Sequence, residues 1–475
     1  MTSSTTALWG ARYGRLTIGL LLTIVGPAFE ALAVATTLPA TVRELGGLEL
    51  YGWAFSAFML ANLVGGAVAG GEADRLGPRI PLIIGSVLFT IGLLLAGFAP
   101  TMPLLIVGRT VQGLGAGIIG AIIYVIIGRG FPAEMKPRLL ALVSTAWVVP
   151  GLIGPALAGL IADTFGWRLV FLAIVPLALI AMALTLPALG DMQGDPGRAR
   201  DMRRIVDAVR IAGGVALALA IPQLVSAFWS SSFARADLSA FAASIGPSVL
   251  SLLALAVPAL IAIPALRRLL PPGTLQAAPG PAAAVAAHGL LTMAFFGADA
   301  YVPLAITEVL RQPSAVGGLA LTGATLGWTT GAWVQERLAA TRSRRLVATS
   351  GMVLVALTIA LFGAGVALSL PAPLIIAIWT FSGLGIGLAF TTFTLSTLEH
   401  ADPAEQGAAS SALQIANSIG SAVGPGVGGI FIGTAVSSTP DPGAIVAHCV
   451  LMTCVALLGL AAARRIPRRP PATAG

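Results

Sequence analysis

The chain has 475 residues, of which 57% are hydrophobic and only 10% are charged, and its mean hydropathy is +0.93. A water-soluble globular domain carries about 25% charged residues, so this composition excludes one and indicates a polytopic membrane protein. The net charge of +8 does not indicate a nucleic-acid partner, because the basic residues stand in short loops between apolar runs. The two cysteines lie together in one apolar run and provide neither a disulfide framework nor a metal site.

Fourteen apolar runs are long enough to cross a hydrocarbon core of about 30 Å, which takes roughly 20 helical residues. The first contains Glu30 in its middle and is longer than the core of a signal peptide, so we expect it to be a retained helix. The predicted fold class is an all-α polytopic membrane protein with 14 transmembrane helices. The runs fall at 16–39, 52–72, 80–100, 103–127, 138–162, 168–190, 208–229, 244–265, 283–309, 314–335, 346–367, 372–397, 407–434 and 443–463.

Lysine and arginine are distributed unevenly between the two sides of these runs. If the N-terminus is inside, cytoplasmic segments hold 22 of the 27 basic residues and exterior loops hold four, while Arg109 lies within a helix. An excess of positive charge marks the cytoplasmic side of a membrane protein. We therefore expect a multi-pass protein of the cell inner (plasma) membrane with both termini in the cytoplasm.

Two segments recur at one offset of 270 residues. The stretch 103–117 matches 373–387 with eight identical positions out of fifteen, and Gly154, Pro155 and Gly159 match Gly424, Pro425 and Gly429. A single offset for separate segments indicates a duplicated half. The predicted division is an N-terminal six-helix half at 1–190, a linker with an inserted helix pair at 191–282, a C-terminal six-helix half at 283–463 and a basic tail at 464–475.

Glu30 and Arg109 are charged residues in the middle of predicted helices. An ionised carboxylate at mid-bilayer depth is costly and burial favours its protonated form, so Glu30 could carry a proton or hold a cationic substrate. The guanidinium of Arg109 is permanently charged and needs carboxylate or carbonyl partners. The structural alternatives are a carboxylate paired to a neighbour and an arginine that bridges helix backbones. Whether the two side chains meet is left open by the sequence.

Further polar and aromatic residues are candidates for a site inside the bundle. Asp299 is a second intramembrane acid, which could face the central cavity. The alternatives are that it pairs with a neighbouring residue or lies near the outer mouth of the protein. Glu308 is expected to be solvated at the exterior end. Five residues are candidates for contact with a substrate: Trp147, Trp379, Phe390, Gln414 and Asn417. The alternative is that they only pack between neighbouring helices.

Several motifs resemble those of the major facilitator superfamily. The loop after the second helix matches the family signature at Gly70, Asp74, Arg75, Gly77, Arg79 and Leu82, whereas Glu72 stands where the family usually has Leu. Leu105, Arg109, Gln112, Gly113 and Gly115 resemble its fourth-helix motif. Gly154, Pro155 and Gly159 resemble the antiporter motif, and 14 helices with an inserted central pair resemble the drug:proton antiporters.

The resemblance implies a major facilitator fold and a secondary transporter, not an enzyme. Its expected activity is proton-coupled export of amphipathic or hydrophobic compounds by alternating access, with the proton gradient as energy source and no cofactor. It implies proton coupling through Glu30 and Arg109, gating by the loop and antiporter motifs, and function as a monomer. We expect Asp299 to take part in proton coupling as the acid that the C-terminal half supplies. The charged loop can hold one conformation closed through contacts with helix ends.

Other functions remain open at this stage. Some fourteen-helix relatives move lipids or glycolipids, so a lipid exporter is the first alternative. Proton-coupled uptake of a small polar metabolite would require more polar residues in the helices that face the cavity than the sequence shows. A membrane enzyme or a receptor would require a soluble domain, a nucleophile with an adjacent base or a ligand cluster, none of which the sequence suggests.

Overall fold

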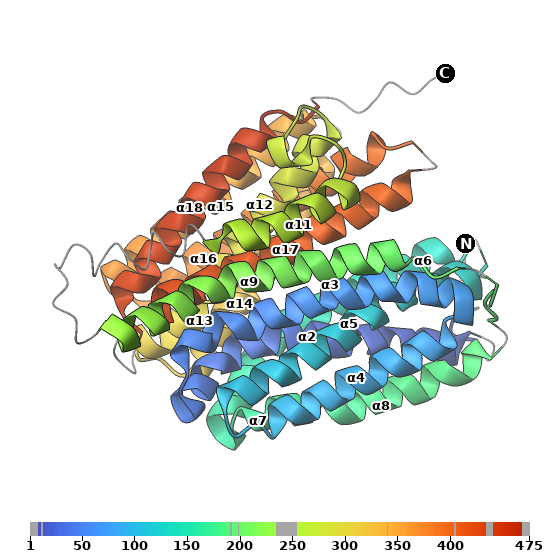
Figure 1. Cartoon of the computed structure of the whole chain (residues 1–475), viewed down its shortest axis with the longest axis horizontal. Helices are drawn as coiled ribbons and strands as arrows, with labels where there is room; N and C mark the ends of the chain where they lie inside the picture. Colours follow the sequence, from blue (N-terminus) through green and yellow to red (C-terminus); the bar gives the residue numbers. More distant parts are fainter. Residues whose placement is uncertain are drawn as a thin grey trace.

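The computed structural model describes residues 8–10, 13–132, 134–190, 192–197, 199–233, 254–339, 341–402, 405–433 and 440–467, and all regular elements in these ranges are helical. A first group of helices, here called the N half, runs from α2 to the short turn η2 (Figure 1). Its members are α2 (Gly14–Leu45), η1 (Leu48–Leu50), α3 (Tyr51–Leu76), α4 (Arg79–Gly97), α5 (Met102–Gly130), α6 (Lys136–Phe165), α7 (Arg168–Leu172), α8 (Ile174–Thr185) and η2 (Leu186–Leu189).

A second group, the C half, follows two inserted helices. The inserted helices are α9 (Met202–Phe233) and α11 (Ala256–Leu269), and the turn η3 (Thr274–Gln276) leads from them into the C half. The C half consists of α12 (Pro281–Asp299), α13 (Val302–Leu304), the π-helical turn η4 (Ala305–Val309), α14 (Ser314–Ala339), α15 (Arg344–Ala367), α16 (Ala372–Glu399), α17 (Gln406–Gly433) and α18 (Pro442–Ala463).

Within the described residues, twelve helical segments are long and apolar enough to cross a membrane. The predicted run at 314–335 corresponds to α14, which is not among the twelve, and the run at 244–265 lies partly outside the described residues. Two predicted runs are interrupted. The interruptions separate α7 from α8 and end α12 at Asp299, and in each case a proline, Pro176 or Pro303, stands four residues after the last helical residue and lacks the amide that would continue the helix.

The same set of helix neighbours recurs in both halves. In the N half α3 and α4 pack on α5, and α2 packs on α6 and α8; in the C half α14 and α15 pack on α16, and α12 packs on α17 and α18. Close approach of the fourth helix of each half depends on glycine, since a Cβ on Gly113 would strike the backbone of Phe58, and one on Gly383 the backbone of Ala324. The two halves therefore share one arrangement of six helices.

The halves meet along two seams, α6 against α14 and α3 against α17. Polar contacts across the seams gather where α2 ends and α3 begins, here called the joined end. Arg43 lies 3.2 Å from Glu308, and the hydroxyls of Tyr51 and Ser56 donate to the carbonyls of Ala300 and Ala422. In Figure 1 the two groups of helices spread apart towards the opposite end, where both chain termini lie. The prediction that Glu308 is merely solvated was wrong, because its carboxylate pairs with Arg43.

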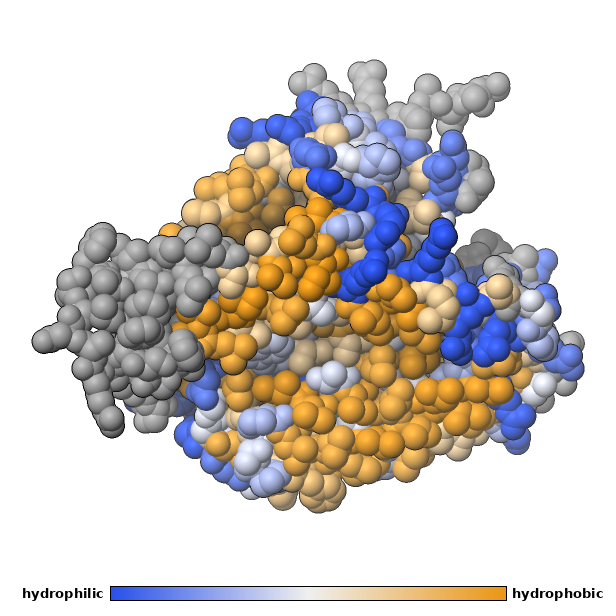
Figure 2. Space-filling model, viewed as in Figure 1, coloured by the Kyte–Doolittle hydropathy of each residue, from blue (hydrophilic) through white to orange (hydrophobic). Residues whose placement is uncertain are grey.

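The outer helices present apolar side chains to the surroundings. On α4 the exposed residues Ile84, Val87, Ile91 and Leu94 follow one another at intervals of three or four, so they form a single stripe. Figure 2 shows apolar surface along the long helices and hydrophilic residues gathered towards the end that carries the termini. This distribution suits a belt of lipid around the bundle.

The inserted helix α9 lies against one seam. It packs on both α3 and α17, so that it touches the N half and the C half together. Near the joined end, the indole of Trp53 donates to the side-chain oxygen of Gln223 at 2.9 Å. Near the opposite end, Arg204 donates to the hydroxyl of Ser411 at 2.8 Å. Helix α11 is attached to α9 by an ion pair between Arg268 and Asp207 at 2.8 Å.

Candidate functional site

A fully buried ion pair lies inside the N half. Glu30 on α2 accepts a hydrogen bond from the guanidinium of Arg109 on α5, and the side chains are 0% and 2% exposed. The pair forms because the middle of α2 faces the middle of α5 within the bundle. The contact that the sequence left open is therefore present.

Three further groups surround the guanidinium of Arg109. It donates to the side-chain oxygen of Gln112 at 2.8 Å and to the backbone carbonyl of Ala54 at 3.0 Å. Its Cζ lies 4.2 Å from the centre of the Phe58 ring, a distance typical of a cation–π contact. A buried arginine is tolerated only when its donors and charge find such partners.

Two atoms of this cluster have no partner. The second carboxylate oxygen of Glu30 and the amide nitrogen of Gln112 are buried, and neither forms a hydrogen bond within the described residues. An unsatisfied buried polar atom destabilises by about 1–3 kcal/mol. A carboxylate with one paired and one free oxygen, held away from water, has a place for one additional proton.

The C half holds a different pair at the related position. Asp299 ends α12, and its carboxylate accepts a hydrogen bond from the indole of Trp379 on α16 at 2.7 Å. Trp379 stands 270 residues after Arg109, so an uncharged donor replaces the cation of the N half. Among the described residues Asp299 forms no ion pair. The intramembrane acids of the two halves thus have different electrostatic surroundings.

The predicted gating loop between α3 and α4 carries a network of charges. Asp74 pairs with Arg129 at the end of α5, at 2.5 Å. Glu72 binds two arginines, Arg75 at 3.0 Å and Arg200 from the segment before α9. Because Glu72 departs from the family signature, the contact with Arg200 adds a link from this loop to the linker.

The other predicted loop residues have distinct places. Gly77 has a φ of +76°, a conformation that favours glycine, and lies against the backbone of the linker. Arg79 is exposed at the start of α4, and a Cβ on Gly70 would meet no atom within 4 Å. The linker itself is bonded to the loop, since the amide of Asp195 donates to the carbonyl of Asp74 at 2.9 Å.

The C half contains a counterpart of this loop that the sequence reasoning missed. Arg344 pairs with Glu399 at 2.5 Å, and these residues stand 270 positions after Asp74 and Arg129. The geometry is repeated while the two charges are exchanged. The offset found in two other segments, applied to Asp74 and Arg129, is the signal that would have identified this pair.

The antiporter-like residues lie on the seam between α6 and α14. A Cβ on Gly159 would come within 2.6 Å of the Cα of Ala315, and the carbonyl of Pro155 lies against Gly318 in the same way. Gly154 instead faces the ring of Phe29 on α2. Asp163, one turn further along α6, accepts hydrogen bonds from the first backbone amides of α14 at 3.3 and 3.1 Å. These residues therefore hold the two halves together at the joined end.

The predicted substrate contacts fall in different places. Trp379 is fully buried and serves as the donor to Asp299, so in this conformation its side chain is inaccessible to a substrate. Phe390 is half-buried and lies 5.2 Å from the ring of Trp328 on α14, a residue that sequence reasoning missed. Gln414 is exposed, and the side-chain oxygen of Asn417 is buried without a hydrogen bond. The side chain of Trp147 lies outside the described part of the structure.

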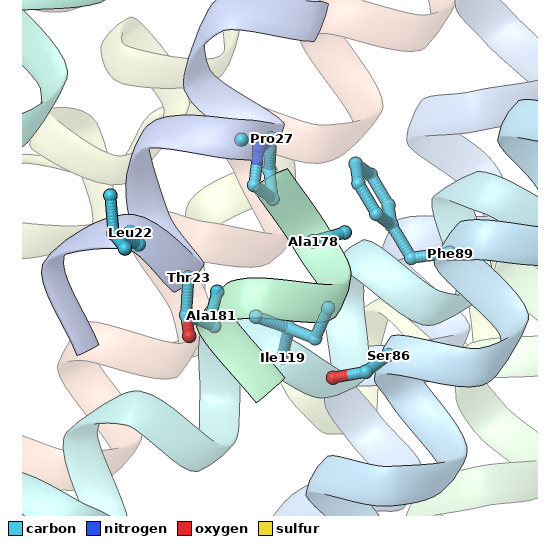
Figure 3. A pocket seen from close by; sticks show the side chains of 9 residues that line it. Leu22, Thr23, Pro27, Ser86, Phe89, Ile119, Ala178 and Ala181 are labelled. Carbon is cyan, nitrogen blue, oxygen red and sulfur yellow. The ribbon is translucent and has the colours of Figure 1, made fainter. Parts of the chain in front are cut away.

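One small pocket lies apart from these residues. It is enclosed by α2, α4, α5 and α8 within the N half, and Figure 3 shows Thr23, Pro27, Ser86 and Phe89 among its side chains. Its free space suffices for about one water molecule. It therefore provides no room for a substrate.

Two six-helix halves that meet at one end, with charged residues buried between their helices, define a membrane transport protein and not an enzyme. The sequence profile of the Major Facilitator Superfamily matches residues 16–298 and 284–475, and the chain belongs to this family.

Similar proteins include two from Mycobacterium tuberculosis that are named as probable multidrug-efflux transporters. Each is 28% identical over 449 residues, which cover 91% of this chain and 91% of that protein. Multidrug resistance protein 3 of Bacillus subtilis is 31% identical over 165 residues, or 35% of this chain and 32% of its own length.

Solved structures share the fold at low sequence identity. An auto-inhibited peptide transporter of the POT family superposes with a TM-score of 0.65 at 16% identity and covers 97% of this chain and 99% of its own. A D-xylose-proton symporter superposes with a TM-score of 0.61 at 16% identity and covers 95% and 98%. These likenesses concern the fold alone.

Proposed function

We propose that this protein exports amphipathic or hydrophobic compounds in exchange for protons by alternating access of the two halves. The observation that carries the proposal is the buried cluster of Glu30, Arg109 and Gln112, in which one carboxylate oxygen is left without a partner. In the proposed cycle that oxygen takes up a proton, which weakens the attraction of Glu30 for Arg109 and alters the packing of α2 against α5. Asp299 is the proposed second proton-coupling group, held by Trp379.

The proposed orientation places the joined end outside and both termini in the cytoplasm. The charged loop of Asp74 and Arg129, its counterpart in the C half and the arginine-rich start of α9 then all lie on the cytoplasmic side. This agrees with the positive-inside rule and suits the inner membrane of a cell. In this orientation the halves are spread towards the cytoplasm, from which a compound to be exported would enter.

Export of apolar compounds is supported by the apolar side chains of α2 that neighbouring helices leave partly uncovered. On α2 the half-buried side chains Leu21, Val25 and Phe29 follow one another at helical spacing, and all three are apolar. A site for a polar metabolite would carry more hydrogen-bonding groups. The names of the Mycobacterium tuberculosis and Bacillus subtilis relatives refer to multidrug efflux or resistance, which favours the same substrate class.

The test is transport in proteoliposomes under an imposed pH gradient, with a lipophilic fluorescent cation as substrate. We expect gradient-dependent movement of the dye in the wild type and its loss in Glu30→Gln, while Glu336→Gln, an exposed residue of α14, transports normally. Normal transport against a gradient by Glu30→Gln would overturn the proton role.

A lipid or glycolipid exporter is the second candidate, because the same apolar side chains on α2 would accommodate an acyl chain. A parallel assay with fluorescent phospholipid distinguishes the two. Movement of lipid without movement of dye would retain alternating access and replace the proposed substrate class. The function is proposed for the monomer, since each chain holds both halves.

A further inference from the structure

The first helix of the C half lies in the interior of the molecule. None of the residues of α12 is exposed, because the helix packs against α16, α17 and α18. Its half-buried side chains Leu290, Met293 and Phe296 follow at intervals of three residues and therefore share a side. Leu290 and Met293 lie against α18 and α17, whereas Phe296 is next to Trp328 of α14, a helix of the seam, so we place the Phe296 end of this side beside the space between the two halves.

Helix α14 brings Trp328 to the same space. Thr325 of α14 is in contact with Gly151 of α6 in the seam. Trp328 is three residues further along and therefore lies on nearly the same side of the helix, one turn closer to the spread end. Its side chain is half-buried, as are those of Phe296 and Phe390.

These three side chains form a continuous aromatic surface. The ring of Trp328 lies 5.2 Å from Phe390 and 6.1 Å from Phe296, distances at which aromatic rings interact. Phe295 and Trp379 support the surface from behind, stacked on each other at 5.5 Å and almost fully buried. The hydrogen bond from Trp379 to Asp299 fixes this second layer, so the front rings rest on a rigid base.

A polar atom lies at the edge of the surface. The ring of His288 is 4.4 Å from that of Phe390, and the Nδ1 atom of His288 is buried without a hydrogen bond among the described residues. In this conformation the atom is covered by its neighbours, so it borders the rings without being accessible to a bound molecule.

The N half has no such surface at the related positions. The residues that stand 270 positions before Phe296 and Phe390 are Gly26 and Gly120, and Trp328 corresponds to Phe58, which is buried beneath Arg109. The buried ion pair thus belongs to one half and the accessible aromatic surface to the other.

We propose that Trp328, Phe390 and Phe296 form a stacking surface that selects substrates with a planar aromatic ring system. The flat faces of these side chains gain most from a flat ligand, which stacks on them over its whole area. A flexible aliphatic compound of equal charge makes a smaller contact with the ring faces, through its methylene groups. The inference rests on the proposed export function, whose substrate class it narrows.

The test compares binding of two probes to purified full-length protein by titration calorimetry. Proflavine is a planar aromatic cation, and tetrapentylammonium is an aliphatic cation. We expect Trp328→Leu and Phe390→Leu to weaken binding of proflavine at least about tenfold and binding of tetrapentylammonium several-fold less, since the aliphatic ion has a smaller contact with the rings to lose.

Each helix provides a matched control. Trp333 on α14 and Phe381 on α16 are 66% and 58% exposed, so Trp333→Leu and Phe381→Leu remove the same side chains from the outer surface. These variants should leave both affinities unchanged, and Trp328→Phe should recover most of the affinity for proflavine. Equal weakening of both probes by Trp328→Leu, or equal losses in the control variants, would overturn the proposal.

Transport of the same probes separates this inference from the proposed function. A wild type that binds proflavine at Trp328 but moves neither probe along a proton gradient would overturn export and leave the stacking surface in place. A wild type that exports tetrapentylammonium but does not bind proflavine would overturn the stacking surface alone.

Discussion

Arg344 donates to the carboxylate of Glu399 at 2.5 Å, and the two residues form with reversed charges the pair that Asp74 and Arg129 form in the other half. Asp74 at the end of α3 is paired with Arg129 at the end of α5. In the C half, Arg344 at the start of α15 is paired with Glu399 at the end of α16. Because the charges are exchanged while the geometry is kept, the requirement at these positions is for attraction and not for a particular sign.

The two pairs should differ in strength. The side chains of Arg129 and Asp74 are 39% and 28% exposed, whereas Arg344 is only 13% exposed. We expect Arg129→Ala to lower the free energy of unfolding by at most about 1 kcal/mol and Arg344→Ala by about 1–3 kcal/mol, since the less exposed pair is less screened by water. Unfolding in mixed micelles measures both. The double reversal Asp74→Arg with Arg129→Asp should restore the stability that either single change removes.

The buried pair in the N half should show strong coupling. Arg109→Gln leaves the carboxylate of Glu30 buried without its counter-charge, which we expect to lower the free energy of unfolding by about 3–5 kcal/mol. Adding Glu30→Gln removes the unpaired charge, so the double variant should be more stable than Arg109→Gln alone. The control is the same set of glutamine variants at the exposed residues Glu336 and Arg337 of α14. There the change in the free energy of unfolding of the double variant should equal the sum of the changes in the two single variants. Additive effects at Glu30 and Arg109 would contradict the contact.

The linker before α9 should depend on the contact between Glu72 and Arg200. The carboxylate of Glu72 raises the pKa of Arg200, so this arginine stays charged at any working pH and salt is the relevant variable. We expect Glu72→Leu or high salt to speed hydrogen exchange of the Asp195 amide several-fold, because that amide donates to Asp74 within the docked linker. Arg203→Ala, at an exposed neighbour, should have no effect. Unchanged exchange in Glu72→Leu would show that the linker is held by other contacts.

The seam between α6 and α14 should be intolerant of added volume. In Gly159→Ala the new methyl group would meet Ala315 and the carbonyl of Ser314, 2.8 Å away, both of which belong to backbone. We expect a loss of about 1–3 kcal/mol in the free energy of unfolding, since neither helix can give way without separating the halves. Gly120→Ala on α5, where nothing lies within 4 Å, should be neutral or slightly stabilising. Thermal unfolding of the two variants side by side provides the comparison, and equal stability would argue against tight contact at this seam.

Much of the fold could be predicted from the sequence, because apolar runs and a repeated offset are properties of the chain alone. The run at 372–397 became α16, and the offset anticipated the shared set of helix neighbours. The breaks after Leu172 and Asp299 could not be predicted, because Pro176 and Pro303 follow them by four residues but prolines such as Pro155 and Pro425 lie inside continuous helices.

The site was less accessible to sequence reasoning, since it depends on how each helix is rotated about its axis. Glu30 and Arg109 are 79 residues apart, and nothing local brings them together. Trp379 was predicted to contact the substrate because of its residue type and its depth in the membrane, but its side chain is buried in the interior of the C half. Trp328 is the tryptophan whose side chain is only half-buried. Gln112 was recognised only as a motif residue, although its side chain completes the shell of the buried arginine.

The inserted helix α9 makes the two long sides of the molecule unequal. One seam is overlaid by a helix that is bonded to Trp53 and Ser411, and the other, formed mainly by α6 and α14, has no such overlying helix among the described residues. A hydrophobic molecule diffusing in the membrane plane therefore meets a covered flank and a bare one. Any rocking of the halves must carry α9 with it or break its bonds, so the motion has a hinge side and a free side.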